Sequence, residues 1–109
     1  MENTGKKISK YASFKGFAMN QASFVIVIDE DHVLGFRRLD GSMGFPGGKV
    51  EPNETPEEAA IRECKEETGY EIVVLDYKPY VCYLDNSQVF YYLGRISGGK
   101  LIEIGRAHV

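Results

Sequence analysis

The 109-residue sequence has no tryptophan, only two cysteines and four prolines, and no long hydrophobic run. No apolar stretch approaches the roughly 18 residues of a membrane-spanning helix, which excludes a protein embedded in a membrane. The two cysteines, Cys64 and Cys82, lie in apolar segments and lack the spacing of a metal site, so we expect reduced, buried thiols. The first residues lack the apolar core of a secretory signal, and a cytoplasmic protein is therefore expected.

The composition favours one small folded domain. Apolar residues make up 43% of the chain, and seven tyrosines and six phenylalanines argue against disorder. A chain of this length corresponds to a single domain. The sequence predicts an N-terminal arm over residues 1–20, the folded domain over 21–97 and a short C-terminal tail over 98–109. This tail resembles a truncated or non-native end more than a natural domain terminus.

Charge is unevenly distributed along the chain, although the net charge is only −3. Residues 1–20 carry four lysines and one glutamate, whereas residues 48–71 carry eight of the eleven glutamates against three cationic side chains. Such a cluster is typical either of a solvated helix face or of a cation site, because crowded carboxylates gain most from a bound ion. It also argues against a protein that binds duplex DNA, whose phosphates are held by lysine and arginine.

Short hydrophobic runs separated by turn residues predict a largely β-stranded protein with two hairpins. A loop is expected over 39–48, where four glycines and a proline let the backbone approach another group closely. The expected strands are residues 23–28, 33–38, 71–77, 80–84 and 88–97, with a short one over 101–104.

One helix is predicted from the signals at its two ends. Thr55 has the position of an N-cap, Pro56 is the first helical residue, and Glu58 completes a capping box with Thr55. Gly69 is the expected C′ residue, which places the helix over Pro56–Thr68. The inward face of this helix is expected to hold Ala60, Ile61, Cys64 and Thr68.

Three carboxylates share one face of the predicted helix. At about 100° per residue, Glu63, Glu66 and Glu67 fall within an arc of about 100°. Lys65 lies on the far side and cannot neutralise them, whereas Arg62 lies beside Glu66. Like charges at this spacing destabilise a helix. A site for a divalent cation with oxygen ligands and a solvated acidic face explain this arc about equally well.

The wider spacing of glycines and charged residues is more specific. From Gly48 the chain reads glycine, five residues, glutamate, seven residues, Arg-Glu-Cys, one residue, Glu-Glu, one residue and Gly-Tyr. This pattern resembles the signature of the Nudix hydrolases, in which the positions of Cys64 and Tyr70 hold bulky aliphatic residues. The residues identical to the signature are Gly48, Glu54, Arg62, Glu63, Glu66, Glu67 and Gly69.

The resemblance implies an α/β (α+β) fold: a mixed, twisted β-sheet with the Pro56–Thr68 helix on one face and the family's second helix missing. It implies a hydrolase that uses Mg²⁺ or Mn²⁺ to cleave a nucleoside diphosphate linked to another group. Glu54 would orient a water or a ligand, and Arg62 would hold a ligand carboxylate through a salt bridge. The implied metal ligands are Glu63, Glu66, Glu67 and the backbone carbonyl of Gly48, and the three glutamates join Glu54 and Arg62 in the catalytic set.

Three further residues are candidates for substrate binding. Arg37 and Arg38 end the second predicted strand, and one of them should point toward the site and hold phosphate, although an exposed pair is as good an explanation. Phe45 opens the lead-in Phe-Pro-Gly-Gly, which the family shares. The tyrosines of the last hairpin could stack a nucleobase, but sheet packing is the favoured interpretation.

Two hypotheses from different classes follow. The first is an active pyrophosphohydrolase with a nucleotide-type substrate. The second is a Nudix-like module that binds metal or nucleotide but lacks a complete catalytic pocket. In either case a single helix can cover only one face of the sheet. The sequence therefore predicts that a second copy of the chain covers the other face in a homodimer.

Overall fold

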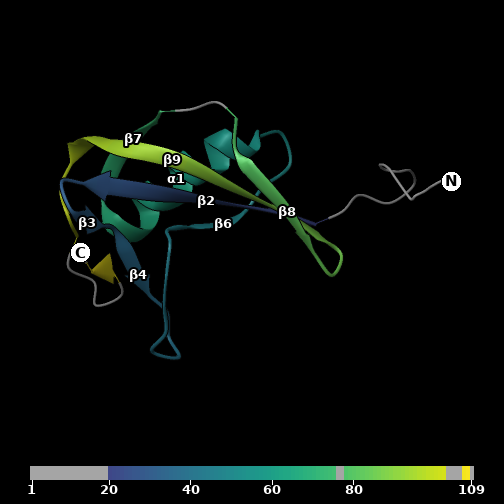
Figure 1. The fold of residues 1–109 in the computed structure, drawn as a ribbon, viewed down its shortest axis with the longest axis horizontal. Coiled ribbons are helices and arrows are strands. Elements are labelled where there is room, and N and C mark those ends of the chain that lie inside the picture. The colour runs from purple at the N-terminus through teal and green to yellow at the C-terminus, as the bar shows by residue number, and fades with distance from the viewer. Residues whose placement is uncertain (1–19, 76–77, 103–106, 109) are drawn as a thin grey trace, which may run out of the picture.

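The structure, a computed structural model, describes residues 20–75, 78–102 and 107–108 (Figure 1). Nearly all of the predicted N-terminal arm, and residues 103–106 and 109 of the predicted tail, lie outside the described residues.

Two long strands form the centre of the main sheet. β2 (Asn20–Asp29) and β9 (Ser87–Gly99) run parallel over eight paired positions, from Asn20 opposite Ser87 to Val27 opposite Gly94. β3 (His32–Val33) and β6 (Gly47–Lys49) pair with β2, while β7 (Tyr70–Val74) and β8 (Tyr80–Leu84) pair with the outer side of β9, all antiparallel. The sheet is therefore mixed, as the resemblance to the Nudix hydrolases implied.

A second, smaller sheet corrects two expectations. The predicted strand over 33–38 is broken at Leu34, which is buried and donates its backbone N–H to the carbonyl of Val27. Beyond this break, β4 (Gly35–Arg37) leaves β2 and pairs with β5 (Met43–Gly44) and β10 (Ala107–His108). The prediction that 39–48 is wholly loop is wrong, since β5 and the start of β6 lie within it. These strands are too short to leave a hydrophobic pattern.

The other predicted strands lie close to their expected positions. β7 begins one residue early and ends at Val74, and residues 76–77 lie outside the described part. β8 matches its prediction, and β9 extends to Gly99. Residues 101–102 are not in a strand, which corrects that part of the expected strand over 101–104.

The only helix in the described part of the chain, α1 (Pro56–Thr68), has the predicted bounds. The Thr55 hydroxyl accepts a hydrogen bond from the Glu58 N–H, and the Glu58 carboxylate accepts one from the Thr55 N–H. Gly69 ends the helix in the left-handed region with φ +89°. Within the described residues no helix is long and apolar enough to cross a membrane.

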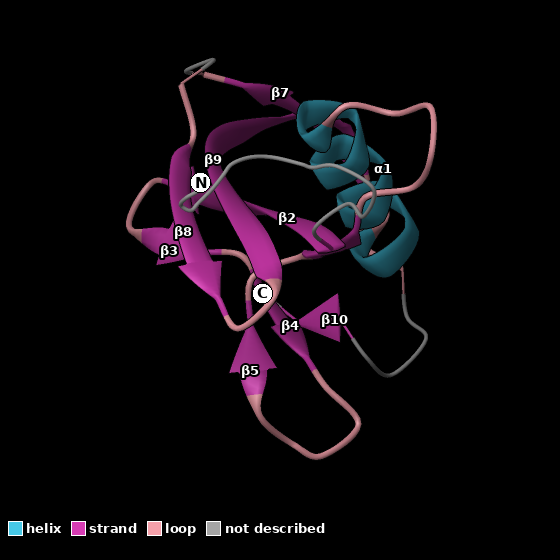
Figure 2. Ribbon diagram, turned by 90° about the vertical axis from the view of Figure 1, so that its right-hand side faces the viewer, coloured by secondary structure: helices cyan, strands magenta, loops and turns pink. Residues whose placement is uncertain are grey.

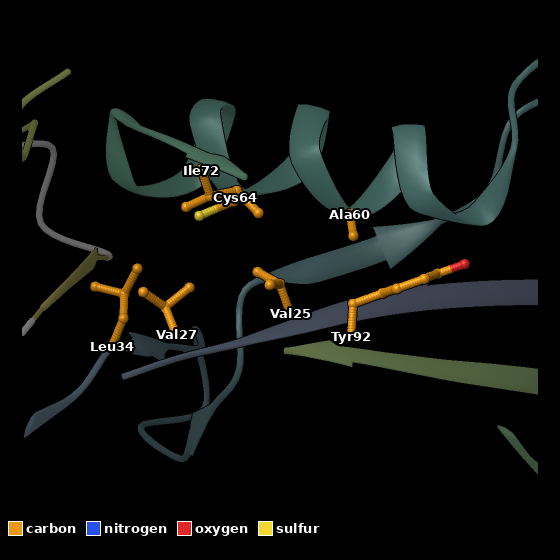
Figure 3. Close-up of a cluster of buried hydrophobic side chains, with 7 residues drawn as sticks. All are labelled: Val25, Val27, Leu34, Ala60, Cys64, Ile72 and Tyr92. Carbon is orange, nitrogen blue, oxygen red and sulfur yellow. The ribbon is translucent and has the colours of Figure 1, made fainter. Parts of the chain in front are cut away.

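The core lies between α1 and the sheet (Figures 2 and 3). Val25 and Val27 of β2 are fully buried and face Ala60 and Cys64 of the helix. Both cysteines of the chain are free. Cys64 is buried as expected, whereas Cys82 is only partly buried, which corrects the expectation for that residue. Burial raises the pKa of the Cys64 thiol, which keeps it neutral. On the predicted inward face of α1, Ile61 is only partly buried, and Ala59 is buried in addition.

The opposite face of the sheet carries apolar side chains that α1 does not cover. Because side chains alternate along a strand, Ile28 of β2, Leu93 of β9 and Val73 of β7 point away from the helix. Their exposed fractions are 49%, 40% and 37%. This agrees with the expectation that one helix covers one face only.

Gly69→Ala tests how tightly the end of α1 is packed. A Cβ at residue 69 would lie 2.2 Å from the carbonyl oxygen of Lys100, whereas a Cβ at Gly41, which also has a positive φ, would meet nothing within 4 Å. We expect Gly41→Ala to lower the free energy of unfolding by about 1–2 kcal/mol, the cost of the left-handed backbone. Gly69→Ala should lower the free energy of unfolding by about 1–3 kcal/mol more than Gly41→Ala does. Urea denaturation of both variants measures the difference, and equal losses would contradict the packing.

Candidate metal and phosphate site

A buried serine holds the glycine loop and the acidic helix in one place. The Ser23 hydroxyl donates a hydrogen bond of 2.6 Å to the carbonyl of Pro56 at the start of α1. Ser23 is fully buried and pairs with Gly48 across β2 and β6. Ser23 therefore contacts both the glycine strand β6 and the start of the acidic helix α1. Sequence reasoning missed Ser23, for which the only signal is a polar residue at the edge of an apolar run.

Arg62 connects the loop to the carboxylates of the helix. Its Nε and one terminal nitrogen donate to the two Glu54 oxygens, at 3.1 and 2.7 Å, and that terminal nitrogen also donates to the Lys49 carbonyl at 3.1 Å. The other terminal nitrogen donates to Glu63 at 3.1 Å and to Glu66 at 3.3 Å. The hydrogen bonds with Glu54 raise the pKa of Arg62 and lower the pKa of Glu54. The side chain of Arg62 is thus fully charged and held in one orientation.

Glu54 also shapes the loop that precedes the helix. Its side chain accepts a hydrogen bond of 3.0 Å from the Glu51 N–H, and its own N–H donates to the Glu51 carbonyl at 3.2 Å. The carboxylate is thus engaged by Arg62 and by the backbone at once. In this arrangement the Glu54 carboxylate fixes the orientation of the Arg62 guanidinium.

Two of the helix carboxylates lie against the backbone of consecutive glycines. The Gly47 N–H donates to Glu67 at 2.9 Å. A Cβ at Gly48 would lie 2.7 Å from a Glu63 carboxylate oxygen, so only glycine lets this carboxylate lie where it does. A Cβ at Gly47 would lie 2.2 Å from the Ser23 carbonyl oxygen. Gly47 is therefore required by its close approach to the backbone of β2, whereas Gly48 leaves room for the Glu63 carboxylate.

The carboxylates are brought together, but they are not arranged as a finished metal site. Within residues 20–75, 78–102 and 107–108, no three acidic, histidine or cysteine side chains converge closely enough to hold an ion as they stand. Arg62 draws Glu63 and Glu66 toward itself, and Gly47 holds one oxygen of Glu67. The candidate ligand atoms are all oxygens, which suits a hard cation such as Mg²⁺. Their chemistry therefore fits a divalent ion.

The two arginines proposed for phosphate binding lie elsewhere. Arg37 is the last residue of β4, and Arg38 follows it in the segment that leads to β5. Both are exposed, and each donates to a nearby backbone carbonyl: Arg37 to Gly41 at 3.2 Å and Arg38 to Met43 at 3.0 Å. Arg38 also donates to the Ser42 hydroxyl at 3.3 Å. The structure does not bring either guanidinium to the helix carboxylates.

Phe45 belongs to a group of aromatic rings next to the glycines. Its ring packs edge-on against Tyr91, with centroids 6.4 Å apart, and the Tyr91 ring stacks on Phe24 at 5.6 Å. Tyr92, by contrast, is buried in the core below α1. Sequence reasoning missed the contact of Phe24 with Tyr91, because only the pairing of β2 with β9 places the two rings side by side.

Comparison with known proteins identifies this arrangement. Residues 19–102 match the family described as the NUDIX domain. The chain belongs to the Nudix family. The spacing from Gly48 to Tyr70, the mixed sheet and the position of α1 are thereby accounted for together.

Relatives of this Nudix chain include a protein of Bacillus subtilis (strain 168) named for 8-oxo-dGTP diphosphatase activity. The two are 40% identical over 91 residues, which cover 78% of this chain and 59% of the relative. The ADP-sugar pyrophosphatase of Mus musculus is 34% identical over 95 residues, covering 75% and 44%. The crystal structure of a NUDIX-family hydrolase from Clostridium perfringens matches with a TM-score of 0.71 at 25% identity, covering 85% and 79%. The chain thus spans about half the length of the two curated relatives.

Glu54→Gln tests the contact with Arg62 through its pH dependence. Because the folded pKa of Glu54 is lowered, its charge stabilises the fold fully above pH 4.5, the ordinary pKa of a glutamate, and less as the pH falls through the lowered pKa. The loss of unfolding free energy in Glu54→Gln should therefore be constant at neutral pH and should shrink in acid. Urea denaturation at a series of pH values, from neutral to acidic, measures this loss.

Glu30→Gln, on the exposed turn after β2, is the matched control and should change stability little at any pH. A loss in Glu54→Gln that stays the same down to strongly acidic pH would contradict the assignment.

Proposed function

We propose that this chain is a metal-dependent pyrophosphohydrolase that cleaves a nucleoside diphosphate linked to another group. The observation that supports it most is the placement of Glu63 and Glu67 against Gly48 and Gly47, with Arg62 joining the loop and the helix. The names of the two curated relatives, a diphosphatase and a pyrophosphatase, support the same class of reaction.

In this proposal Mg²⁺ or Mn²⁺ is held by oxygen ligands of the chain. When bound, such an ion neutralises phosphate oxygens and lowers the pKa of a coordinated water. Arg62, held by its bidentate contact with Glu54, contacts Glu63 and Glu66, so Arg62 and Glu54 would position these two carboxylates as ligands. The proposed ligands are Glu63, Glu66, Glu67 and the carbonyl of Gly48.

Substrate contacts are proposed for three residues outside the carboxylate group. Arg37, at the end of β4, and Arg38, directly after it, carry exposed positive charge that suits a substrate phosphate. Phe45 lies two residues before Gly47 and offers an apolar contact beside the phosphates. We place the enzyme in the cytoplasm on the strength of its two free cysteines, and assign its catalytic domain to residues 21–97.

A binding module without turnover is the second candidate. Arg62 already engages oxygens of Glu63 and Glu66, so an ion has to compete with the guanidinium for them. A module of this kind would bind Mg²⁺ or a nucleotide but would release no product. Incubation with Mg²⁺, 8-oxo-dGTP and an ADP-sugar, followed by identification of the products, separates the two. Formation of a nucleoside monophosphate supports the hydrolase.

Mg²⁺ should stabilise the folded protein through the proposed ligands. At about 100 times its dissociation constant, a ligand that binds only the folded state adds about 2.7 kcal/mol. Glu67→Gln should remove most of this increment and most of the hydrolysis. The amide oxygen of a glutamine can still accept from the Gly47 N–H, so the metal-free variant should be about as stable as the wild type. Thermal unfolding with and without Mg²⁺ measures the increment.

Glu71→Gln is the matched control, since Glu71 is exposed on β7 and pairs with Lys65 rather than with Arg62. It should keep the full Mg²⁺ increment. If Glu67→Gln keeps it as well, the metal site lies elsewhere.

We further propose a homodimer in which a second copy covers the exposed sheet face around Ile28, Leu93 and Val73. Soluble proteins rarely leave more than a few hundred Å² of contiguous apolar surface in water. Leu93→Glu, in the centre of this face, should shift the protein to monomers, whereas Leu39→Glu, on the exposed β4–β5 turn, should not. Light scattering at micromolar concentration measures the mass, and a monomeric wild type would contradict the proposal.

A further inference from the structure

Ser23 is the polar member of the row of β2 side chains that faces α1. Side chains alternate along a strand, so Ser23 lies on the same side of the sheet as Val25 and Val27, which pack under the helix (Figure 3). All three residues are fully buried. A buried hydroxyl costs free energy unless it is hydrogen-bonded. Ser23 meets this requirement by donating to the Pro56 carbonyl at 2.6 Å, which ties β2 to the first turn of α1.

The apolar contacts between α1 and the sheet fix the position of the helix only weakly. Apart from Thr68, the buried residues of α1 are Ala59, Ala60 and Cys64, whose small side chains allow close approach but interlock little with their neighbours. Burial of apolar surface also has no preferred direction. A hydrogen bond, by contrast, requires a defined distance and angle. The bond from Ser23 therefore fixes the start of α1 relative to β2.

The strand that carries the glycines is held on β2 independently of this hydroxyl. Ser23 pairs with Gly48 across β2 and β6. Directly after β6, the Val50 N–H donates to the Gln21 carbonyl at 2.9 Å. These contacts are made by the backbone, so they do not require the Ser23 side chain. Loss of the hydroxyl should therefore displace α1 relative to β6 without undoing the strand pairing.

Two carboxylates of α1 depend on this relative position. Glu63 lies where a Cβ at Gly48 would be 2.7 Å from its oxygen, and Glu67 accepts from the Gly47 N–H at 2.9 Å. A helix rises about 1.5 Å per residue. Ligands of a metal ion must keep their distances within about 0.2 Å. A displacement of α1 by a fraction of one residue is therefore enough to spoil an ion site made by these carboxylates.

We propose that Ser23 is a positioning residue of the metal site, which sets the affinity for a divalent ion without itself being a ligand. This inference rests on the proposed function, which places the ion at Glu63 and Glu67. The Ser23 hydroxyl acts through the Pro56 carbonyl on the start of α1. Replacing residues that hold metal ligands in place typically changes metal affinity by about 10- to 100-fold.

The test compares Ser23→Ala with Val27→Ala, a second truncation in the same row of β2. Val27 is equally buried but lies beyond the pairing of β2 with β6, which ends at Phe24. Val27→Ala therefore destabilises the core by leaving a cavity, while the start of α1 keeps its bond to Ser23. In Ser23→Ala the Pro56 carbonyl keeps a donor, because in an α-helix it also accepts from residue 60.

Two measurements are made at a temperature at which both variants are folded. The affinity for Mn²⁺ is obtained from the EPR signal of the free ion. Without metal, NMR follows hydrogen exchange of the Gly47 N–H, which reports the contact with Glu67, and of the Val50 N–H, which reports the pairing of β6 with β2.

We expect Ser23→Ala to weaken Mn²⁺ binding by about tenfold or more. Val27→Ala should bind Mn²⁺ like the wild type, although it unfolds at a lower temperature. The ratio of the Gly47 exchange rate to the Val50 exchange rate should rise in Ser23→Ala only. Unchanged Mn²⁺ affinity in Ser23→Ala, an equal loss in Val27→Ala, or an unchanged exchange ratio in Ser23→Ala would overturn the inference.

Hydrolysis by the wild type distinguishes this inference from the proposed function. If the wild type hydrolyses nucleotides and Ser23→Ala matches it in Mn²⁺ affinity and amide exchange, the role of Ser23 is wrong and the hydrolase stands. If the wild type hydrolyses no nucleotide but Ser23→Ala still weakens Mn²⁺ binding and raises the exchange ratio, the role of Ser23 stands and the hydrolase is wrong.

Discussion

The contact between Arg62 and Glu54 is the interaction on which the site depends. Glu51, Glu54, Glu63 and Glu66 all have carboxylate oxygens within 4 Å of this one guanidinium. Without it these negative charges would repel one another across the gap between the loop and the helix. The planar fork of arginine allows one side chain to hold Glu54 with two nitrogens and still reach two helix carboxylates. A lysine would supply the charge but not this geometry.

Two glycines, Gly47 and Gly48, allow the close approaches that the site needs, because they have no side chain. The Arg62 network brings Glu63 close to β6, and that approach is possible because residue 48 has no side chain. The backbone of Gly47 lies against Ser23 and Phe24. The same residue thus lets the strand pair with β2 and presents its N–H to Glu67. Attraction from arginine and close approach at glycine together place the carboxylates.

The helix and the two hairpins could be predicted because their signals are local. The capping residues Thr55 and Glu58 and the glycine at position 69 lie within a few residues of the ends they define, and the structure has these bounds. The short strands β5, β6 and β10 could not be predicted. Two or three residues carry no periodicity, and the pairing of β6 with β2 and of β10 with β4 joins strands that are distant in sequence.

For the site, the sequence by itself determined which residues are candidates for the chemistry. The spacing along the helix predicted its acidic face, because a helix converts spacing directly into direction. The resemblance of the motif from Gly48 to Tyr70 to the Nudix signature indicated the family. Only the tertiary structure decided what those residues touch. Arg62 engages Glu54 because β6 and α1 are both anchored at Ser23, and Phe24 meets Tyr91 because β2 and β9 run parallel. Contacts between segments far apart in sequence depend on strand order and register, which no local pattern encodes.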